Sequence, residues 1–426
     1  MRLLIENGAA HLGNLGDAAM LQIAVQRLRK YLPEAQLHVV TGNPGKLRGI
    51  DPELIPLPLQ AVEEWAGTKH AFATPKSRAG RLSRQLKAQL KWRFAARAAR
   101  RFVKTGRHPD NLVPLIQSAS AVLSSGGGLI NRKFPKNSHR LLHTLRLAQA
   151  LGKPTAAFGL GIDEPVDQRM QGYCRDVFPG LSCLALRESL VGSRFIANLG
   201  RPIRWQVTGD DAIGLVPESL PSTPAARHIG INIRLARHTA IPRQTLPVLK
   251  NVISSRARRE QLRLRNLPVT VIERPHRDSD CKSTSELFGS EIDQWPEDCQ
   301  NLTPRQLILA TGQCRLVISV SYHACVFALA LGIPTIALYA DPYYHNKHAG
   351  LCAMFGNLSS LVDLRQPDFE AQLQTALDRE LNRDRGQRLR LRELAARQRG
   401  LSEQAYAGFC QKLAALSQNR QPETDQ

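Results

Sequence analysis

The chain has 426 residues, enough for two or three domains, and 42% of them are hydrophobic, which excludes a wholly disordered chain. Only 5% are aromatic, which argues against base stacking as the main binding device. The net charge is +22. The segment between Trp65 and Pro109 contains 13 Lys and Arg and no Asp or Glu, and such a basic segment favours an anionic partner.

Strands and helices alternate along the first half of the chain. We expect a strand at 2–6, a glycine-rich loop, and a helix from about 17 to 31 with Asp17 as its cap. A second helix is expected at about 138–151, and further strands at 37–41, 121–124, 155–158, 183–186 and 205–207. This alternation is typical of an α/β domain with a parallel sheet, here residues 1–218.

A basic insertion at about 65–109 interrupts this first domain. An apolar residue recurs every fourth position, which places one stripe on a helix: Leu82, Leu86, Leu90, Phe94, Ala98 and Phe102. Two interpretations stay open. The helix either packs on the domain through this stripe, or lies on a membrane surface through residues 82–102, attracted to anionic lipid headgroups. Since no nucleic-acid motif accompanies it, nucleic acid is not an expected partner.

The second half repeats the α/β pattern after a linker rich in Pro, Ser and Thr. We expect a second α/β domain at 228–365, charge-rich helices at 366–417 and a polar tail at 418–426. Its strands are expected at 228–233, 269–273, 316–319 and 335–339. The run from Leu316 to Ala340 has no formal charge and could cross a bilayer, but Gly332 and Pro334 divide it into strand, helix and strand.

The cysteines and the N-terminus favour a cytoplasmic protein. None of the eight cysteines lies at CxxC spacing, and the chain is too long and too poor in Cys for a secreted disulfide scaffold, so we expect free thiols. The short N-terminal apolar run meets Glu6 at once, unlike a signal peptide. His276, Asp278, Asp280 and Cys281 match no familiar zinc spacing, so we expect neither a metal nor a cofactor.

Three loops that follow expected strands have residues suited to chemistry. The loop Gly13–Asp17 opens a helix, whose first N–H groups can bind an anion or sugar hydroxyls. Gly126-Gly127-Gly128 lies at the carboxyl end of a strand, where open α/β sheets bind ligands. His323 lies between a buried strand and a helix, in the expected crevice between the domains. A plain helix cap, a helix–sheet contact and a structural histidine are the respective alternatives.

The order and spacing of these motifs resemble the polysaccharide pyruvyl transferase family, over about residues 1–360 without the basic segment. The resemblance rests on Asn14-x-Gly16-Asp17, Gly126-Gly127-Gly128, Leu160-Gly161-Ile162, Arg187-Glu188-Ser189 and His323-Ala324 with Gly332-Ile333-Pro334. It implies two Rossmann-like domains facing a cleft, a GT-B-like fold. It also implies transfer of a pyruvyl group from phosphoenolpyruvate to a sugar of a cell-surface polysaccharide or of its lipid-linked precursor, with release of phosphate.

The resemblance suggests roles for individual residues. His323 is the implied acid that protonates the donor's methylene carbon. The donor's phosphate and carboxylate need cations, for which the candidates are Arg234, Arg187 and Lys347. The acceptor-binding candidates are Asn14, Asp17, Gly127 and Gly128. Members commonly have Arg-x-His where this chain has Ser321-Tyr322-His323, so an arginine that would grip the donor is missing there.

Two other functions fit parts of the sequence. A GT-B glycosyltransferase would use a nucleotide sugar, but no Asp or Glu lies between Arg315 and Asp341 to bind the ribose or sugar. A non-catalytic membrane-surface protein of polysaccharide assembly would depend on the basic helix and would be unaffected by His323→Ala. Such a protein, like a transferase acting on lipid-linked acceptors, would be peripheral at the inner face of the membrane.

Overall fold

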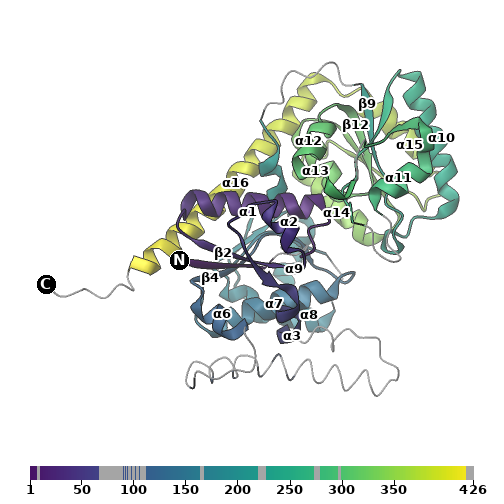
Figure 1. Cartoon of the computed structure of the whole chain (residues 1–426). Helices are drawn as coiled ribbons and strands as arrows, with labels where there is room; N and C mark the ends of the chain where they lie inside the picture. The colour runs from purple at the N-terminus through teal and green to yellow at the C-terminus, as the bar shows by residue number, and fades with distance from the viewer. Residues whose placement is uncertain are drawn as a thin grey trace.

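The chain folds into two α/β domains, each built around a parallel sheet with helices packed on it (Figure 1). The computed structural model describes residues 1–6, 10–66, 112–163, 167–218, 227–272, 279–295 and 299–418, with residues 90, 92, 94, 97, 101 and 105 of the basic segment. Two Rossmann-like domains were the expectation from sequence, and this arrangement confirms it.

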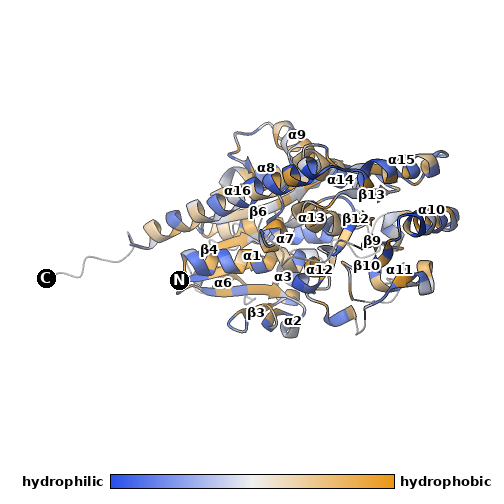
Figure 2. Ribbon diagram, turned by 90° about the horizontal axis from the view of Figure 1, so that it is seen from above, coloured by the Kyte–Doolittle hydropathy of each residue, from blue (hydrophilic) through white to orange (hydrophobic). Residues whose placement is uncertain are grey.

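The N-terminal sheet has the strand order β3-β2-β1-β4-β6-β7-β8, with β5 paired to β6. The strands are β1 (Arg2–Glu6), β2 (Gln36–Thr41), β3 (Ile55–Pro58), β4 (Ala121–Ser124), β5 (Gly127–Ile130), β6 (Thr155–Ile162), β7 (Cys183–Leu186) and β8 (Gln206–Val207). Its helices are α1 (Leu15–Tyr31), α2 (Pro44–Arg48), α3 (Leu59–Ala66), α6 (Leu112–Ser118), α7 (Pro135–Ala150), α8 (Gln168–Val177) and α9 (Leu190–Asn198). Every residue of β4 and β6 is buried, which explains their continuous apolar sequences, and both strands are coloured hydrophobic in Figure 2.

The C-terminal sheet has the strand order β11-β10-β9-β12-β13-β14. The strands are β9 (His228–Asn232), β10 (Arg263–Asn266), β11 (Ile292–Asp293), β12 (Cys314–Ser319), β13 (Thr335–Tyr339) and β14 (Ser360–Asp363). The helices are α10 (Leu246–Arg259), α11 (Asp280–Phe288), α12 (Pro304–Thr311), α13 (Tyr322–Ala330), α14 (Pro342–Met354) and α15 (Phe369–Leu381). The uncharged run is thus strand, helix and strand, and no helix among the described residues is long and apolar enough to cross a membrane.

The last helix, α16 (Arg385–Gln418), leaves the C-terminal domain and runs beside α1 along the N-terminal domain (Figure 1). Tyr406 stacks on Phe158 at a ring-centroid distance of 3.8 Å, and its hydroxyl donates to Asp211 Oδ2 over 2.9 Å. Asp211 also accepts from Ser402 and pairs with Arg27 of α1 over 3.4 Å. One carboxylate after β8 therefore ties the crossing helix to the first domain.

Two expectations about local structure are wrong. Residues 269–272 do not form a sheet strand, because β10 fills the place beside β9. Their backbone instead reaches the N-terminal domain: Leu15 N–H donates to the Val269 carbonyl over 2.8 Å, and Val271 N–H donates to the Gly13 carbonyl over 2.9 Å. Asp17 does not cap α1, because Asn14 Oδ1 accepts from the N–H groups at 16 and 17.

The cysteines and the basic insertion also depart from expectation. Cys281 and Cys299 form a disulfide, since α11 and the turn at 299–301 bring their Cα atoms within 6.7 Å, while the other six cysteines are free. In the basic segment, Leu90 and Phe94 are exposed, so the described members of the apolar stripe do not pack on the domain. The other stripe members lie outside the described residues, as do His276 and Asp278.

Candidate active site

A cavity of about 630 Å³ lies between the two domains, a size usual for small-molecule sites. Helix and strand ends of both domains line it, and the backbone contacts between 13–15 and 269–271 form part of its wall. Seven of the eight candidates predicted from sequence line this cavity: His323, Arg234, Arg187, Lys347, Asn14, Asp17 and Gly128. The eighth, Gly127, is not a lining residue.

His323 is the second residue of α13 and packs against the start of α1 in the other domain. An ideal Cβ built on Gly16 would lie only 1.9 Å from His323 Cγ, so a glycine is needed for this contact. The imidazole is 5% exposed, and its Nε2 lies 3.7 Å from Asp210 Oδ2. Burial, with the positive charges of Lys347 and Arg187, lowers the pKa of His323 well below its ordinary value. The ring is therefore neutral at pH 7.

Arg187 follows β7 and crosses the bare backbone of two glycines. An ideal Cβ built on Gly161 would lie 2.4 Å from Arg187 Nε, and one built on Gly128 would lie 3.2 Å from Nη2. Side chains at these two positions would therefore displace the guanidinium. The guanidinium carbon lies 4.3 Å from the ring centre of Tyr322, a cation–π contact. Part of the glycine-rich sequence thus exists to admit an arginine into the cavity wall.

Lys347 projects from α14 among three tyrosine rings. Its Nζ lies 5.0 to 5.8 Å from the ring centres of Tyr343, Tyr322 and Tyr344, and 3.4 Å from the Tyr343 hydroxyl. Burial first, and the charge of Arg187 second, lower the pKa of Lys347 to about 7, while Asp17 acts in the opposite direction. The ammonium is therefore poised to gain or lose a proton near neutral pH.

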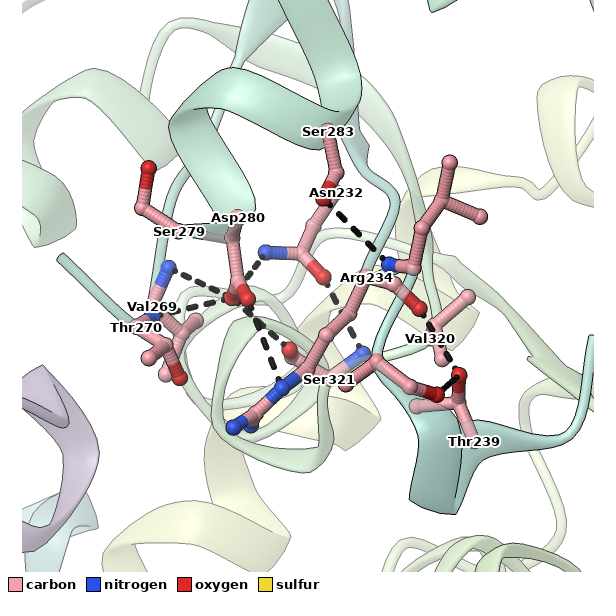
Figure 3. Close-up of polar contacts among 12 residues, drawn as sticks. Asn232, Arg234, Thr239, Val269, Thr270, Ser279, Asp280, Ser283, Val320 and Ser321 are labelled. Carbon is pink, nitrogen blue, oxygen red and sulfur yellow. Dashed lines mark hydrogen bonds and ion pairs between the residues drawn. The ribbon is translucent and has the colours of Figure 1, made fainter. Parts of the chain in front are cut away.

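Arg234 lies just after β9 and is held by a buried carboxylate (Figure 3). Its Nε lies 3.6 Å from Asp280 Oδ1. The other oxygen, Oδ2, accepts four hydrogen bonds of 2.9 to 3.1 Å, from the N–H groups of Val269 and Thr270, the Asn232 amide and the Ser321 hydroxyl. Ser321 thus helps to hold the aspartate that anchors Arg234.

Sequence reasoning missed several residues of this site. Asp210 follows β8 at the same sheet edge as Arg187, and that position could have pointed to it. The tyrosines around Lys347 had no signal, because their common position depends on how α13 and α14 pack. Lys133 also lines the cavity and bridges the domains, since its Nζ lies 2.7 Å from Asp341 Oδ2 and 3.0 Å from the His238 carbonyl.

The arrangement suits a small ligand with more than one negative charge. Three cations, a neutral imidazole and bare backbone converge in one cavity, where burial of these side chains from water strengthens charge–charge attraction. Among the residues the structure describes, no group of His, Cys, Asp or Glu could hold a metal ion.

Comparison with known proteins gives a family and a fold. The family model described as polysaccharide pyruvyl transferase matches residues 14–342. A putative UDP-N-acetylglucosamine 2-epimerase from Listeria monocytogenes has a similar structure, with a TM-score of 0.56 and 13% identity over 100% of this chain and 97% of that one. A glycosyltransferase of kitacinnamycin has a TM-score of 0.51 and 9% identity over 98% of each chain. These identities show a shared GT-B-like fold alone. No curated protein matches the sequence.

Proposed function

The chain belongs to the polysaccharide pyruvyl transferase family, and from this premise we propose that it transfers the pyruvyl group of phosphoenolpyruvate to a sugar. The acceptor in this proposal is a cell-surface polysaccharide or its lipid-linked precursor. One observation carries the choice of donor: Arg187, Arg234 and Lys347 converge on the same cavity as the imidazole of His323.

The donor's charges match this set of cations. Phosphoenolpyruvate carries a phosphate and a carboxylate, and the guanidinium groups of Arg187 and Arg234 can each bind a planar or tetrahedral anion with two hydrogen bonds. Lys347 adds a point charge near neutral pH. Because these groups are held by Tyr322, Asp280 and the tyrosine rings, they need little reorganisation as phosphate leaves.

The proposed reaction consumes two acceptor hydroxyls. His323 delivers a proton to the methylene carbon, and the first hydroxyl oxygen attacks the carbon that becomes electrophilic. The second hydroxyl oxygen forms the other bond of the cyclic ketal as the bond between that carbon and the bridging phosphate oxygen breaks, and the electron pair leaves with phosphate. One hydroxyl proton replaces the proton that His323 gave to the new methyl group, and the other leaves with phosphate, so atoms and charge balance.

We assign the acceptor side of the cavity to the start of α1 and the loop before β5. Asn14 Oδ1 is occupied by the helix cap, so its amide nitrogen is the group left to donate to a sugar oxygen. Burial raises the pKa of Asp17, against the opposing charges of Lys347, Arg187 and Arg234, and its carboxyl can accept from a hydroxyl. Gly128 offers bare backbone, while Gly127 contributes its φ of +116° to the loop rather than a contact.

Phosphate release tests this proposal. Purified protein is incubated with phosphoenolpyruvate and free or lipid-linked glycans, and His323→Ala serves as the inactive comparison. Acceptor-dependent phosphate release that His323→Ala abolishes supports the proposal. Release of a nucleotide from a nucleotide sugar, without consumption of phosphoenolpyruvate, would instead identify a glycosyltransferase. Release of neither phosphate nor nucleotide by the wild type, with polysaccharide assembly unaffected by His323→Ala, would favour the non-catalytic assembly protein.

We also propose that the basic segment contacts anionic lipid. Trp92 anchors it to the domain: the indole stacks on Tyr173 at 3.8 Å and donates to Asp176 over 2.9 Å. Leu90 and Phe94, two residues to either side, are 41% and 49% exposed and so face away from that anchor. Vesicle flotation should show that the protein binds vesicles of phosphatidylglycerol but not of phosphatidylcholine. The variant L90E/F94E should bind the phosphatidylglycerol vesicles more weakly. Unchanged binding in that variant would exclude this face.

A further inference from the structure

We propose that Asp210 is a positioning residue that holds a proton in common with His323 and passes it to the imidazole when the anionic donor binds. This inference rests on the proposed pyruvyl transfer and adds a residue that the sequence motifs do not contain. It follows from three polar atoms that meet behind the cavity wall.

The three atoms are Asp210 Oδ2, His323 Nε2 and Arg187 Nη1. Oδ2 lies 3.7 Å from Nε2 and 4.0 Å from Nη1. All three are buried, and within the described part of the chain none has a hydrogen-bond partner. Buried polar atoms are costly when unpaired, and catalytic hydrogen bonds are often long before substrate arrives. A shift of a few tenths of an ångström would pair the carboxylate with the imidazole.

The carboxylate is rigidly placed from both sides. Asp210 Oδ1 accepts from Ala212 N–H over 2.9 Å, which leaves Oδ2 as the oxygen that faces His323. The next residue, Asp211, is fixed by Arg27, Ser402 and Tyr406. Nε2 is the nitrogen of His323 that is turned toward Asp210, while Nδ1 lies beside Gly16 of α1.

Burial arranges where the proton rests. It raises the pKa of Asp210 to about 7, against the opposing charge of Arg187, with Asp211 and Asp17 adding to the rise. It lowers the pKa of His323, together with Lys347 and Arg187. The raised pKa of Asp210 and the lowered pKa of His323 both favour the proton of the pair on the Asp210 carboxyl. An anionic donor beside the ring favours the imidazolium, so the proton moves from Oδ2 to the imidazole, which then protonates the methylene carbon.

The kinetic test is Asp210→Asn, which keeps the shape of the side chain but cannot give up a proton. We expect kcat for phosphate release to fall about 10²-fold while the KM for phosphoenolpyruvate changes little. The alkaline limb of the pH profile should move to lower pH, because the imidazolium loses its carboxylate partner. Asp210→Glu should restore part of the rate. A tenfold rise in KM with unchanged kcat would overturn the proposal. It would mean that Asp210 only positions Arg187 for donor binding.

The control is Tyr406→Phe, which loosens the same loop through Asp211 without removing the Asp210 carboxyl. It should lower Tm but leave the pH profile of the folded enzyme unchanged. A shift of the pH profile equal to that of Asp210→Asn would show that loop position alone explains the effect.

A second readout does not depend on activity. The imidazole signals of His323, assigned by their absence in His323→Ala, are followed by NMR at pH 7 while inorganic phosphate is added. We expect a shift toward the imidazolium in the wild type and a smaller one in Asp210→Asn. Equal shifts would overturn the proposal. An Asp210-dependent shift in a protein that releases no phosphate from phosphoenolpyruvate would retain the proton pair and reject the donor.

Discussion

Gly16→Ala should disable the site by displacing His323 across the domain boundary. The new Cβ would lie 1.9 Å from His323 Cγ, 2.1 Å from Nδ1 and 2.4 Å from Cβ. The last of these atoms cannot move without the backbone of α13, so rotation of the ring alone gives no relief. Alanine gains about 0.5–1 kcal/mol of helix propensity, but overpacking costs about 1–3 kcal/mol, so we expect lower stability. A 1 Å displacement of an acid can cost about 10²-fold in rate.

The assay is acceptor-dependent phosphate release, with Tm measured alongside. Gly172→Ala in α8 is the matched control, because no described atom lies within 4 Å of its new Cβ. That control should keep the wild-type rate and gain about 0.5–1 kcal/mol of stability. A Gly16→Ala enzyme with the wild-type kcat would refute the reasoning, because it would mean that His323 can move away from α1 and still act.

Three further substitutions test individual contacts. Lys347→Met should abolish activity yet raise Tm at pH 7. The pKa of Lys347 is about 7 in the fold, so the wild type alone gains stability as pH rises from 7 toward 10.5, and the two Tm values should converge. Lys133→Ala should raise the KM for phosphoenolpyruvate several-fold and change the free energy of unfolding by about 1 kcal/mol or less, since it removes the partly exposed bridge to Asp341. Asp280→Asn should raise the KM for phosphoenolpyruvate and lower the free energy of unfolding by about 3 kcal/mol, because a neutral amide would face the buried charge of Arg234. An unchanged KM would contradict the anchoring role of Asp280.

Much of the fold could be predicted because its strands are buried on both faces. The apolar runs of β4, β6, β12 and β13 gave a clear pattern, and the intervening helices fixed a parallel sheet. The same reasoning failed at 269–273. Val269, Val271 and Ile272 contact Leu15 and Gly13 at the start of α1 in the other domain, and a single sequence does not distinguish that contact from a sheet position.

The site was predictable where function follows strand ends. Arg187 follows β7 directly and His323 lies four residues after β12, so the rule that ligands bind at the carboxyl ends of parallel strands pointed to one residue on each sheet. The anchoring groups follow no such rule. Asp280 lies 46 residues after Arg234 in the chain and reaches it through the packing of α11 on β9, and the tyrosines gather around Lys347 only because α13 and α14 pack together.

The placement of Asp210 and Asp211 explains why the two domains must act together. One carboxylate faces His323 of the C-terminal domain, and its neighbour binds α16, the helix that returns from that domain. Any motion that separates the domains must therefore either pull His323 from Asp210 or strain the buried contacts of Asp211. Because the proposed proton pair forms only between the domains, it predicts that donor protonation requires the contact between Asp210 and His323. A donor bound to the C-terminal cations alone would stay intact until the acceptor side is in place.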